Sequence, residues 1–342
     1  MTKLMLERKK NKQFTDNPIN TLGKMMQTMR PSNTKTLYNF IDDYILPLGA
    51  TMDHAGNAII RVGDSKVLWS SHTDTVHRVS GQQRVVVNGD MLKLGHGSFS
   101  NCLGADCTTG VWIMREMILN NVAGLYVFHD SEEIGGIGSS WLAKHHKGLL
   151  DGIDYAIAFD RKGYDSIITH QSGGRCASDI FAKSLAKQLP NSYQTDDTGT
   201  FTDTANYTSI IGECTNISVG YFAQHTANET QSISHALELR DAMLRFDETK
   251  LTKSRNAGDI DHDGFDYRFG GYDRHYKGYY GDNGYYDYGF KSNTKDKKRS
   301  YSNFYDMVDY IQDNADAVAD MLDQHGITLN DIIDHVEISS KG

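Results

Sequence analysis

Residues 69–76 read Trp-Ser-Ser-His-Thr-Asp-Thr-Val, and the interpretation of the whole chain starts from this stretch. An apolar run from Val67 to Trp69 leads into His72 and, two residues later, Asp74. Residues two apart in a strand point to the same side, so both side chains are expected at one spot where a buried strand reaches the surface. A metal-binding imidazole needs an acceptor on its other ring nitrogen, which a nearby carboxylate can supply. Alone, the pair is weak evidence, because both residue types are common on surfaces.

Composition excludes several classes of protein. The chain has 342 residues and a net charge of -9, which suits one large domain with or without an appendage and argues against a nucleic-acid-binding surface. Residues 1–14 are basic but no apolar stretch follows, so we expect no signal peptide, and no apolar run is long enough for a membrane span. Four cysteines without Cys-x-x-Cys spacing predict reduced thiols and a cytoplasmic protein: Cys102, Cys107, Cys176 and Cys214.

Short apolar strands alternate with helical patterns along the first 250 residues. Helices are predicted at 36–45, 109–119, 139–146, 178–189 and 232–246, with a further helical segment ending near Pro31. Strands are predicted at 58–62, 66–69, 125–128, 155–159 and 217–219, and Asn88-Gly89 predicts a hairpin between 84–87 and 91–94. This alternation predicts an α/β domain over 16–250, with a mainly parallel sheet, mixed at its edges, and helices on both faces.

The two ends of the chain differ from this domain. Residues 1–15 are predicted to be a basic tail and 251–300 a flexible segment, because 22 of the 32 residues from Asp259 to Phe290 are Tyr, Gly or Asp. Residues 301–342 are predicted to form a helical appendage with one apolar seam: Phe304, Val308, Ile311, Ala315, Val318 and Leu322. The seam either docks on the main domain or joins two copies into a homo-oligomer.

Acidic or imidazole side chains follow the ends of predicted strands or precede a helix at four further places. They are Asp106 before a helix, the pair Glu132-Glu133 after 125–128, Asp160 after 155–159 and His225 after 217–219. A doubly wound sheet gathers its site at such positions. Imidazole and carboxylate ligands suit zinc, or cobalt or manganese. Of two adjacent glutamates, one can ligate a metal while its neighbour acts as a base.

These motifs occur in a specific order: His-x-Asp-Thr-Val, Gly-Ala-Asp, Glu-Glu-x-Gly-Gly, strand-Asp and Gly-Tyr-x-x-x-His-Thr. Over roughly residues 35–248 the set resembles the co-catalytic dinuclear zinc exopeptidases, which include aminopeptidases, carboxypeptidases and acyl-amino-acid deacylases. The resemblance implies two zinc ions that activate a water, with Asp74 orienting His72, Glu132 as general base and a cis peptide after Asp106. It also implies the metal ligands, which are Asp106 as the bridge, His72 and Asp160 on one ion, and Glu133 and His225 on the other.

The spacing within the resemblance favours one branch of the clan. Only 64 residues separate Asp160 from His225, too few for the lid domain that many carboxypeptidase-like members insert there. The chain is therefore expected to be a compact aminopeptidase acting on a small peptide. Residues 202–207 resemble a Ser-Asp-His-x-x-Phe stretch of such enzymes, so Asp203 is a candidate for binding a substrate ammonium, with a helix N-cap at Thr202 as the alternative.

Two further alternatives remain open. Arg161, Lys162 and Arg175 are either surface charges or the partners of an anionic substrate end, which would suit a carboxypeptidase or an N-acyl-amino-acid deacylase. The other alternative is a non-catalytic interaction or assembly protein built on this fold, with the C-terminal parts as its working elements. Against that alternative, every ligand and the base implied by the resemblance are present.

Overall fold

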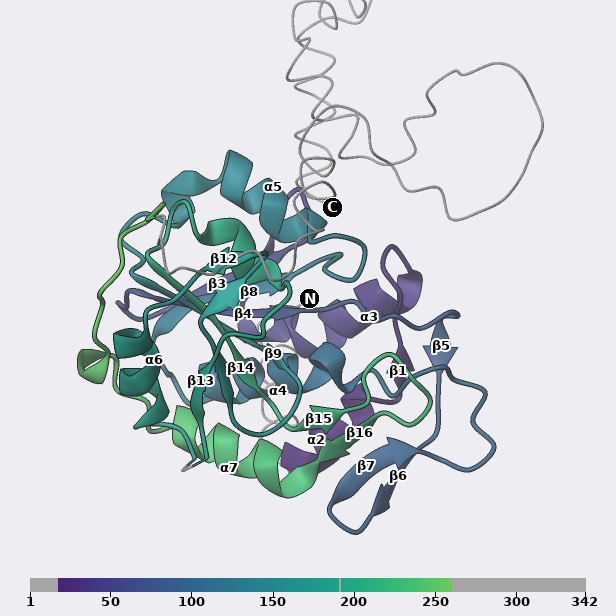
Figure 1. The fold of residues 1–342 in the computed structure, drawn as a ribbon. Helices are drawn as coiled ribbons and strands as arrows, with labels where there is room; N and C mark the ends of the chain where they lie inside the picture. Colours follow the sequence, from purple (N-terminus) through teal and green to yellow (C-terminus); the bar gives the residue numbers. More distant parts are fainter. Residues whose placement is uncertain (1–17, 191, 260–342) are drawn as a thin grey trace, which may run out of the picture. The chain divides into compact units, whose positions relative to one another are not determined.

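The computed structural model describes residues 18–190 and 192–259, and its centre is an eight-stranded sheet (Figure 1). The strand order is β13-β10-β14-β9-β4-β8-β3-β2. The central strands β14, β9, β4 and β8 are parallel, whereas β10 and β3 run antiparallel to them at the two sides. The predicted mainly parallel sheet with mixed edges is thus confirmed. The strands are β2 (Thr51–Met52), β3 (Ala58–Val62), β4 (Val67–His72), β8 (Gly124–His129), β9 (Tyr155–Arg161), β10 (Ser166–Ile168), β13 (Gln194–Asp196) and β14 (Glu213–Ser218).

Both faces of the central sheet are covered. Every residue of β4, β8 and β14 is buried, as expected for parallel strands between two layers. Trp69 stacks on Phe159 and meets Phe246 on one face, while His129 packs against Tyr207 on the other. Because side chains alternate along a strand, Trp69 and His72 of β4 point to opposite faces.

Two groups of helices form these layers. Helix α4 (Ala105–Leu119) packs on β4, β9 and α7 (Ile233–Met243), and α5 (Ile137–His145) packs on the 3-10 helix η3 (Asp203–Tyr207), which carries Tyr207 on the opposite face. Figure 1 shows α5 and α4 on either side of the sheet. The remaining helices are α2 (Pro18–Met25), α3 (Lys35–Tyr44), α6 (Asp179–Ala186) and the 3-10 turns η1 (Leu46–Leu48), η2 (Lys147–Leu149) and η4 (Glu248–Lys250).

A second sheet of four strands, in the order β15-β16-β7-β6, lies beside the first (Figure 1). The predicted hairpin forms β6 (Val85–Asn88) and β7 (Met91–Leu94), with Gly89 at φ 61° in its turn. Strand β7 pairs with β16 (Thr230–Ser232), which pairs with β15 (Tyr221–Phe222), so the hairpin is tied to the segment that carries His225. Two further pairs are short: β1 (Thr28–Met29) with β5 (Gly81–Gln82), and β11 (His170–Gln171) with β12 (Gly174–Arg175).

The described part extends a little beyond the predicted domain. Leu251 and Arg255 are buried, and the backbone N–H groups of Ser254 and Arg255 donate to Glu213 of β14 at 2.8 and 2.9 Å. The predicted basic tail 1–15, the rest of the predicted flexible segment, and the C-terminal helix proposed for oligomerisation lie outside the described residues.

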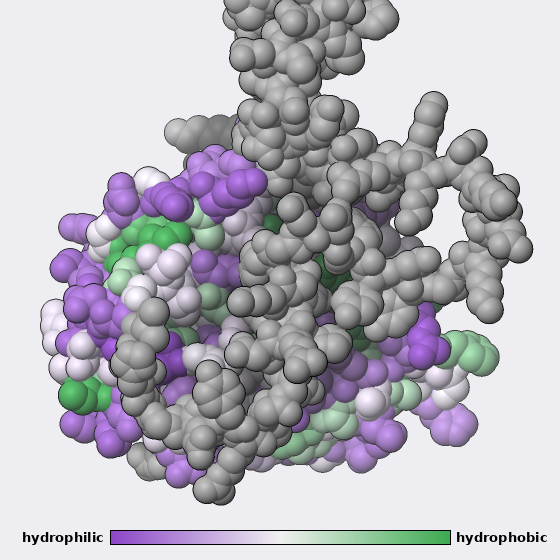
Figure 2. Space-filling model, turned by 45° about the horizontal axis from the view of Figure 1, so that its top comes forward, coloured by the Kyte–Doolittle hydropathy of each residue, from purple (hydrophilic) through white to green (hydrophobic). Residues whose placement is uncertain are grey.

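Hydrophilic residues dominate the surface that Figure 2 leaves visible, and hydrophobic ones appear there in small patches. In the described part of the chain no helix is both long and apolar enough to cross a membrane. All four cysteines are free and buried.

Gly110 allows α4 to lie directly on β9, which makes it a test of this packing. A Cβ atom at Gly110 would sit 2.2 Å from the Phe159 carbonyl oxygen and 2.7 Å from Ser71 Oγ. We expect Gly110→Ala to lower the free energy of unfolding by about 1–3 kcal/mol, since the clash involves backbone that cannot yield. Denaturant titration measures this. Gly23→Ala in α2 is the matched control: a Cβ there meets nothing within 4 Å, so the substitution should stabilise by about 0.5–1 kcal/mol. Equal effects at both positions would refute the close helix–sheet contact.

Candidate active site

Asp106 lies between two histidines that are 153 residues apart in the sequence. Its Oδ1 is 3.1 Å from His72 Nε2, and its Oδ2 is 3.2 Å from His225 Nε2. His72 ends β4, Asp106 lies in the first turn of α4, and His225 follows β15, so three separate elements meet here. The peptide bond after Asp106 is cis, as the resemblance implied. One carboxylate facing two imidazoles with different oxygens has the arrangement of a bridging ligand.

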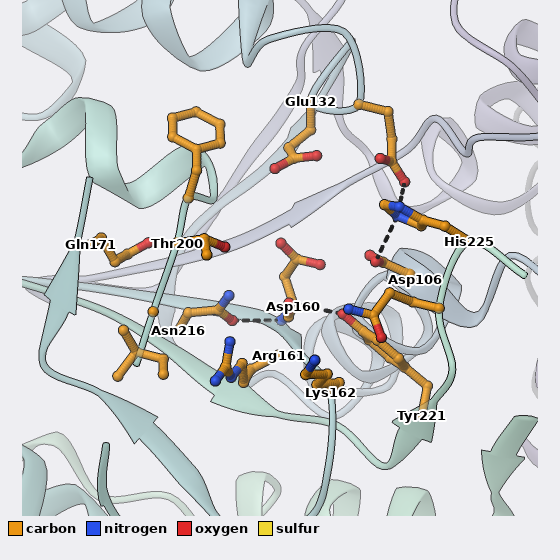
Figure 3. Close-up of a pocket in the computed structure, with 15 residues that line it drawn as sticks. Asp106, Glu132, Asp160, Arg161, Lys162, Gln171, Thr200, Asn216, Tyr221 and His225 are labelled. Carbon is orange, nitrogen blue, oxygen red and sulfur yellow. Dashed lines mark hydrogen bonds and ion pairs between the residues drawn. The ribbon is translucent and has the colours of Figure 1, made fainter. Parts of the chain in front are cut away.

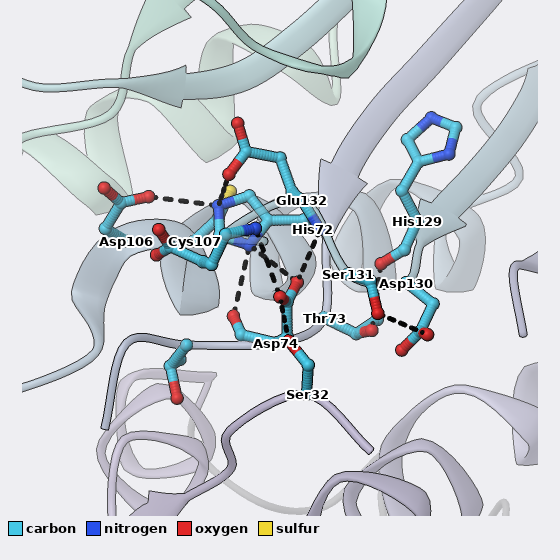
Figure 4. A network of polar contacts seen from close by, with 12 residues as sticks. Ser32, His72, Thr73, Asp74, Asp106, Cys107, His129, Asp130, Ser131 and Glu132 are labelled. Carbon is cyan, nitrogen blue, oxygen red and sulfur yellow. Dashed lines mark hydrogen bonds and ion pairs between the residues drawn. The ribbon is translucent and has the colours of Figure 1, made fainter. Parts of the chain in front are cut away.

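His72 is held in one orientation by its ring nitrogens (Figure 4). Its Nδ1 donates to the Asp74 carbonyl oxygen at 3.1 Å and lies 3.4 Å from the Asp74 carboxylate. Its Nε2 therefore points at carboxylates, with Asp160 Oδ1 at 3.3 Å and Glu132 Oε2 at 4.0 Å. The ring is thus placed as in a metal-ligating histidine, in which one ring nitrogen donates to an acceptor, here Asp74, and the other faces the metal site.

Asp74 does more than the sequence predicted for it. Besides facing His72, its carboxylate accepts the backbone N–H groups of Glu132 and Glu133 at 3.1 and 3.2 Å and the hydroxyl of Ser32 at 2.7 Å. Burial opposes its ionisation, yet the hydrogen bond and charge of His72, together with the hydrogen bonds from Ser32 and Glu133, outweigh it and lower the pKa of Asp74 below its usual range. One buried carboxylate thus positions a histidine and both glutamates.

Asp160, at the end of β9, is fixed on three sides. Asn216 Oδ1 accepts its backbone N–H at 2.9 Å, Tyr221 donates to its carbonyl oxygen at 3.1 Å, and Thr202 donates to its Oδ2 at 2.6 Å. Thr202 does occupy the N-cap position of η3, but its side chain makes no capping hydrogen bond. The predicted N-cap is therefore correct in position and wrong in contact, because the Thr202 hydroxyl donates to Asp160 and accepts no backbone N–H of η3. Burial and the charge of Asp106 raise the pKa of Asp160 to about 7.

A cavity of about 310 Å³ opens over this group (Figure 3). Asp106, Glu132, Glu133, Asp160 and His225 all line it. Burial, together with neighbouring carboxylates, raises the pKa of Glu132 well above its usual value. Several lining residues have no counterpart in the sequence-based prediction of the site, and they come from β11, from β14 and from the segments after β13 and β15: Gln171, Gly199, Thr200, Phe201, Asn216 and Gln224.

The donor set fits a metal ion. Ligand atoms of Asp106, Glu133 and His225 lie within 4.8 Å of one another, and so do those of His72 with Glu132 and Glu133. Glu133 Oε1 is buried and makes no hydrogen bond to the described residues, although it lies 3.3 Å from His225 Nε2. Buried carboxylate oxygens are costly without a partner, and a divalent cation is one that imidazole and carboxylate groups together bind well.

Cys107 also lies near His72 and Asp160 but has another partner. Its thiol donates to the Phe159 carbonyl oxygen at 2.8 Å, and burial raises the pKa of the thiol well above its usual value. A protonated, hydrogen-bonded thiol is a poor ligand, so Cys107 is better described as packing beneath the site.

The two predicted substrate-binding residues do not reach the cavity. Asp203 is fully buried at the start of η3, where burial raises its pKa to about 8 and neither carboxylate oxygen makes a hydrogen bond in the described structure. Arg175, on β12, forms an ion pair with Asp179 of α6 at 2.9 Å and does not line the cavity. Arg161 and Lys162, by contrast, do line it.

Glu229 is a buried residue that sequence reasoning missed. Its carboxylate accepts the backbone N–H groups of Leu103, Gly104 and Asp106 at 2.8, 2.9 and 3.1 Å. It therefore holds the turn that presents Asp106. No sequence pattern signals this role, because the partners are backbone groups 123 to 126 residues away.

The fold is that of known peptidases. The chain is similar to an aminopeptidase PepT from Bacillus cereus, with a TM-score of 0.55, 13% identity, and coverage of 66% of this chain and 96% of that chain. It is also similar to a tripeptidase from Staphylococcus aureus, with a TM-score of 0.54, 15% identity, and coverage of 68% of this chain and 97% of that chain. A third similar structure is the TET1 peptidase of Pyrococcus horikoshii, with a TM-score of 0.52, 16% identity, and coverage of 67% of this chain and 98% of that chain. The predicted zinc-exopeptidase-like fold is confirmed, and at these identities the likeness concerns the fold alone. No protein-family model and no curated protein sequence matches the chain.

The first prediction for the site concerns Glu229. In Glu229→Gln an amide NH2 replaces one acceptor, so at least one of the three N–H groups loses its partner and Asp106 is less firmly placed. We expect zinc affinity to fall about 10- to 100-fold, measured by competition with a chromophoric chelator. Glu213→Gln is the matched control, because Glu213 is also buried and accepts backbone N–H groups, but at the start of β14, away from the site. Unchanged zinc affinity in a folded Glu229→Gln protein would contradict the positioning role.

A second prediction concerns acid stability. His77 is buried, with Nδ1 2.7 Å from Thr75 Oγ1 and Nε2 3.1 Å from the Cys102 carbonyl oxygen, and burial lowers its pKa from 6.5 to about 4. At this residue the unfolded chain therefore binds more protons between these values, so the contribution of His77 to stability falls as the pH drops from 6.5 toward 4. This contribution changes by up to about 3 kcal/mol. The unfolding free energy of His77→Gln should therefore rise relative to that of the wild type as the pH falls over that window. An identical pH dependence of both proteins would exclude this role of His77.

Proposed function

We propose that this chain is a metal-dependent exopeptidase, an aminopeptidase that hydrolyses small peptides with two zinc ions in the site around Asp106. The observation that carries the proposal is the position of the Asp106 carboxylate, whose two oxygens face His72 and His225 separately. Asp160 lies beside His72, and Glu133 lies beside His225. Each of the two proposed zinc positions therefore has one carboxylate besides Asp106. Similarity in fold to an aminopeptidase and a tripeptidase supports the same conclusion.

Zinc bound here would polarise a scissile carbonyl group and make a water molecule more acidic. His72, Asp106 and Asp160 would hold one ion, and Asp106, Glu133 and His225 the other. Cobalt or manganese also accepts these ligands, because metal supply as well as affinity decides occupancy.

Glu132 is the residue that the proposed ligand set leaves free. Its carboxylate lines the cavity, and its backbone is held by Asp74. A raised pKa suits a group that takes a proton from water and gives it to the leaving nitrogen, because such a group works best with a pKa near the working pH. Glu132 is therefore assigned as general base and Asp74 as the residue that positions it.

The test replaces this base without removing a ligand. Glu132→Gln should bind zinc like the wild type and lose about 100-fold or more in kcat on aminoacyl substrates. Zinc content by elemental analysis and peptide hydrolysis are measured on the same preparation. Glu133→Gln is the matched control, and it should lose zinc affinity as well as activity. Near wild-type turnover by Glu132→Gln would overturn the assignment, and a wild-type chain that neither binds zinc nor cleaves peptides would overturn the function.

Arg161 and Lys162 favour a second candidate, a carboxypeptidase or N-acyl-amino-acid deacylase, because both cations line the cavity. Blocking one substrate end decides between them. An aminopeptidase should fail to cleave N-acetylated peptides, whereas the second class should cleave them.

A further inference from the structure

The cavity carries two cationic side chains besides its acidic group. Arg161 is the last residue of β9 and Lys162 follows it, directly after Asp160. Figure 3 shows both on the side of Asp160 away from Glu132. Among the described residues, every carboxylate that lines the cavity belongs to the proposed metal ligands or is the proposed base, so this part of the chain gives Arg161 and Lys162 no further acidic partner on the cavity wall.

Arg161 is held in place but only partly neutralised. Its Nη2 donates to Thr198 Oγ1 at 2.8 Å and lies 3.4 Å from Asp196 Oδ2. Asp196 has shorter hydrogen bonds from Ser166 and Thr198, at 2.6 to 2.7 Å, so Arg161 is its most distant partner. Nε of Arg161 is buried and donates to no atom of the described chain. A guanidinium with unused donors and a poorly paired charge is unfavourable unless an anion joins it.

Lys162 adds a second, exposed charge on a fixed backbone. Its side chain makes no ion pair within the described ranges. Its carbonyl oxygen accepts the Ser218 hydroxyl at 2.7 Å, and the Arg161 carbonyl oxygen accepts Val219 N–H at 2.8 Å. The strand end is thus anchored to β14 while the ammonium stays available to a ligand.

The charge balance of the loaded site then favours an anionic substrate. Two divalent cations would offset the four carboxylates of Asp106, Glu132, Glu133 and Asp160, which leaves the positive charge of Lys162 in excess beside Arg161, whose charge is only partly neutralised by Asp196 at 3.4 Å. A cavity with surplus charge of one sign concentrates ligands of the opposite sign. At about 310 Å³ it is also at the small end for ligand sites.

We propose that Arg161 and Lys162 bind a carboxylate of the substrate, so that the site selects short peptides whose free α-carboxylate reaches this pair. The proposal rests on the proposed function and adds its substrate class. Arg161 supplies the directional hydrogen bonds and Lys162 the mobile charge. A side-chain carboxylate of Asp or Glu has the same chemistry and is the other possible source.

The substrate test uses the zinc-loaded full chain and three matched peptides. They are Leu-Gly-Gly as the free acid, the same peptide as its C-terminal amide, and Leu-Gly-Asp as its C-terminal amide. We expect kcat/KM for the free acid to exceed that for the first amide about 10- to 100-fold, mostly through KM. Restored hydrolysis of the Asp-containing amide would show that a side-chain carboxylate also serves, which supports the carboxylate site. Equal kcat/KM for acid and both amides would overturn it.

Substitutions test whether Arg161 and Lys162 cause the preference for the free acid. Lys162→Gln and Arg161→Gln should each lower kcat/KM for the free acid more than for the Leu-Gly-Gly amide, so that the ratio of the two values falls toward one. Lys162 is exposed, so its variant tests the proposal even where Arg161→Gln fails to fold. Arg175→Gln removes the same charge outside the cavity and should keep the full preference. A preference that survives both cavity variants would contradict the assignment.

A binding measurement distinguishes failure of the carboxylate site from failure of the proposed exopeptidase function. Calorimetry with glycylglycine and glycylglycinamide on the wild type and Lys162→Gln needs no turnover. Tighter binding of the acid, lost in the variant, supports the carboxylate site even if the chain cleaves no peptide. Hydrolysis combined with equal binding of acid and amide leaves the exopeptidase function intact and overturns the carboxylate site.

Discussion

The site depends on one electrostatic constraint, the gathering of four carboxylates in a single partly buried cavity. Two like charges 4 Å apart repel by about 4 kcal/mol at an effective dielectric constant of 20, so the group is unfavourable unless positive charge balances it. The raised pKa values of Glu132 and Asp160 show that repulsion and burial together oppose ionisation. The pKa of Asp74 is not raised, because its carboxylate faces four hydrogen-bond donors. The four carboxylates are thus placed where cations would balance their charge. The buried Asp74 positions His72, Glu132 and Glu133 from the side opposite the cavity.

Topology explains why these residues meet. The parallel strands β4, β8 and β9 end at the same edge of the sheet, where they deliver His72, Glu132 with Glu133, and Asp160. The antiparallel second sheet brings the His225 segment to that edge from the side. Positions directly after buried strands were visible in the sequence, which is why this part of the site and the central sheet could be predicted. The two- and three-residue strands could not, since they are too short to show a period.

Other residues could not be placed from sequence for different physical reasons. A charge such as Arg175 has no periodic signature, and only tertiary structure shows that it pairs with Asp179. Asp203 stood in a plausible motif, yet the packing of η3 buries it completely. Thr202 has the local pattern of a cap, but its hydroxyl is oriented toward the Asp160 carboxylate of β9 and not toward a backbone N–H of η3. Local patterns predict local contacts, whereas the acceptor of the Thr202 hydroxyl lies 42 residues away, and even Arg175 and Asp179, four residues apart, are joined by a side-chain geometry that spacing alone does not show.

Glu229 gives the second sheet a mechanical connection to the site. It directly precedes β16, whose Thr230 pairs with Lys93 of the β6–β7 hairpin, and its carboxylate grips the turn that presents Asp106. A shift of the hairpin along β16 would therefore also move Asp106, whose carboxylate faces both histidines. The position of Asp106 between His72 and His225 therefore depends on the second sheet as well as on the central sheet.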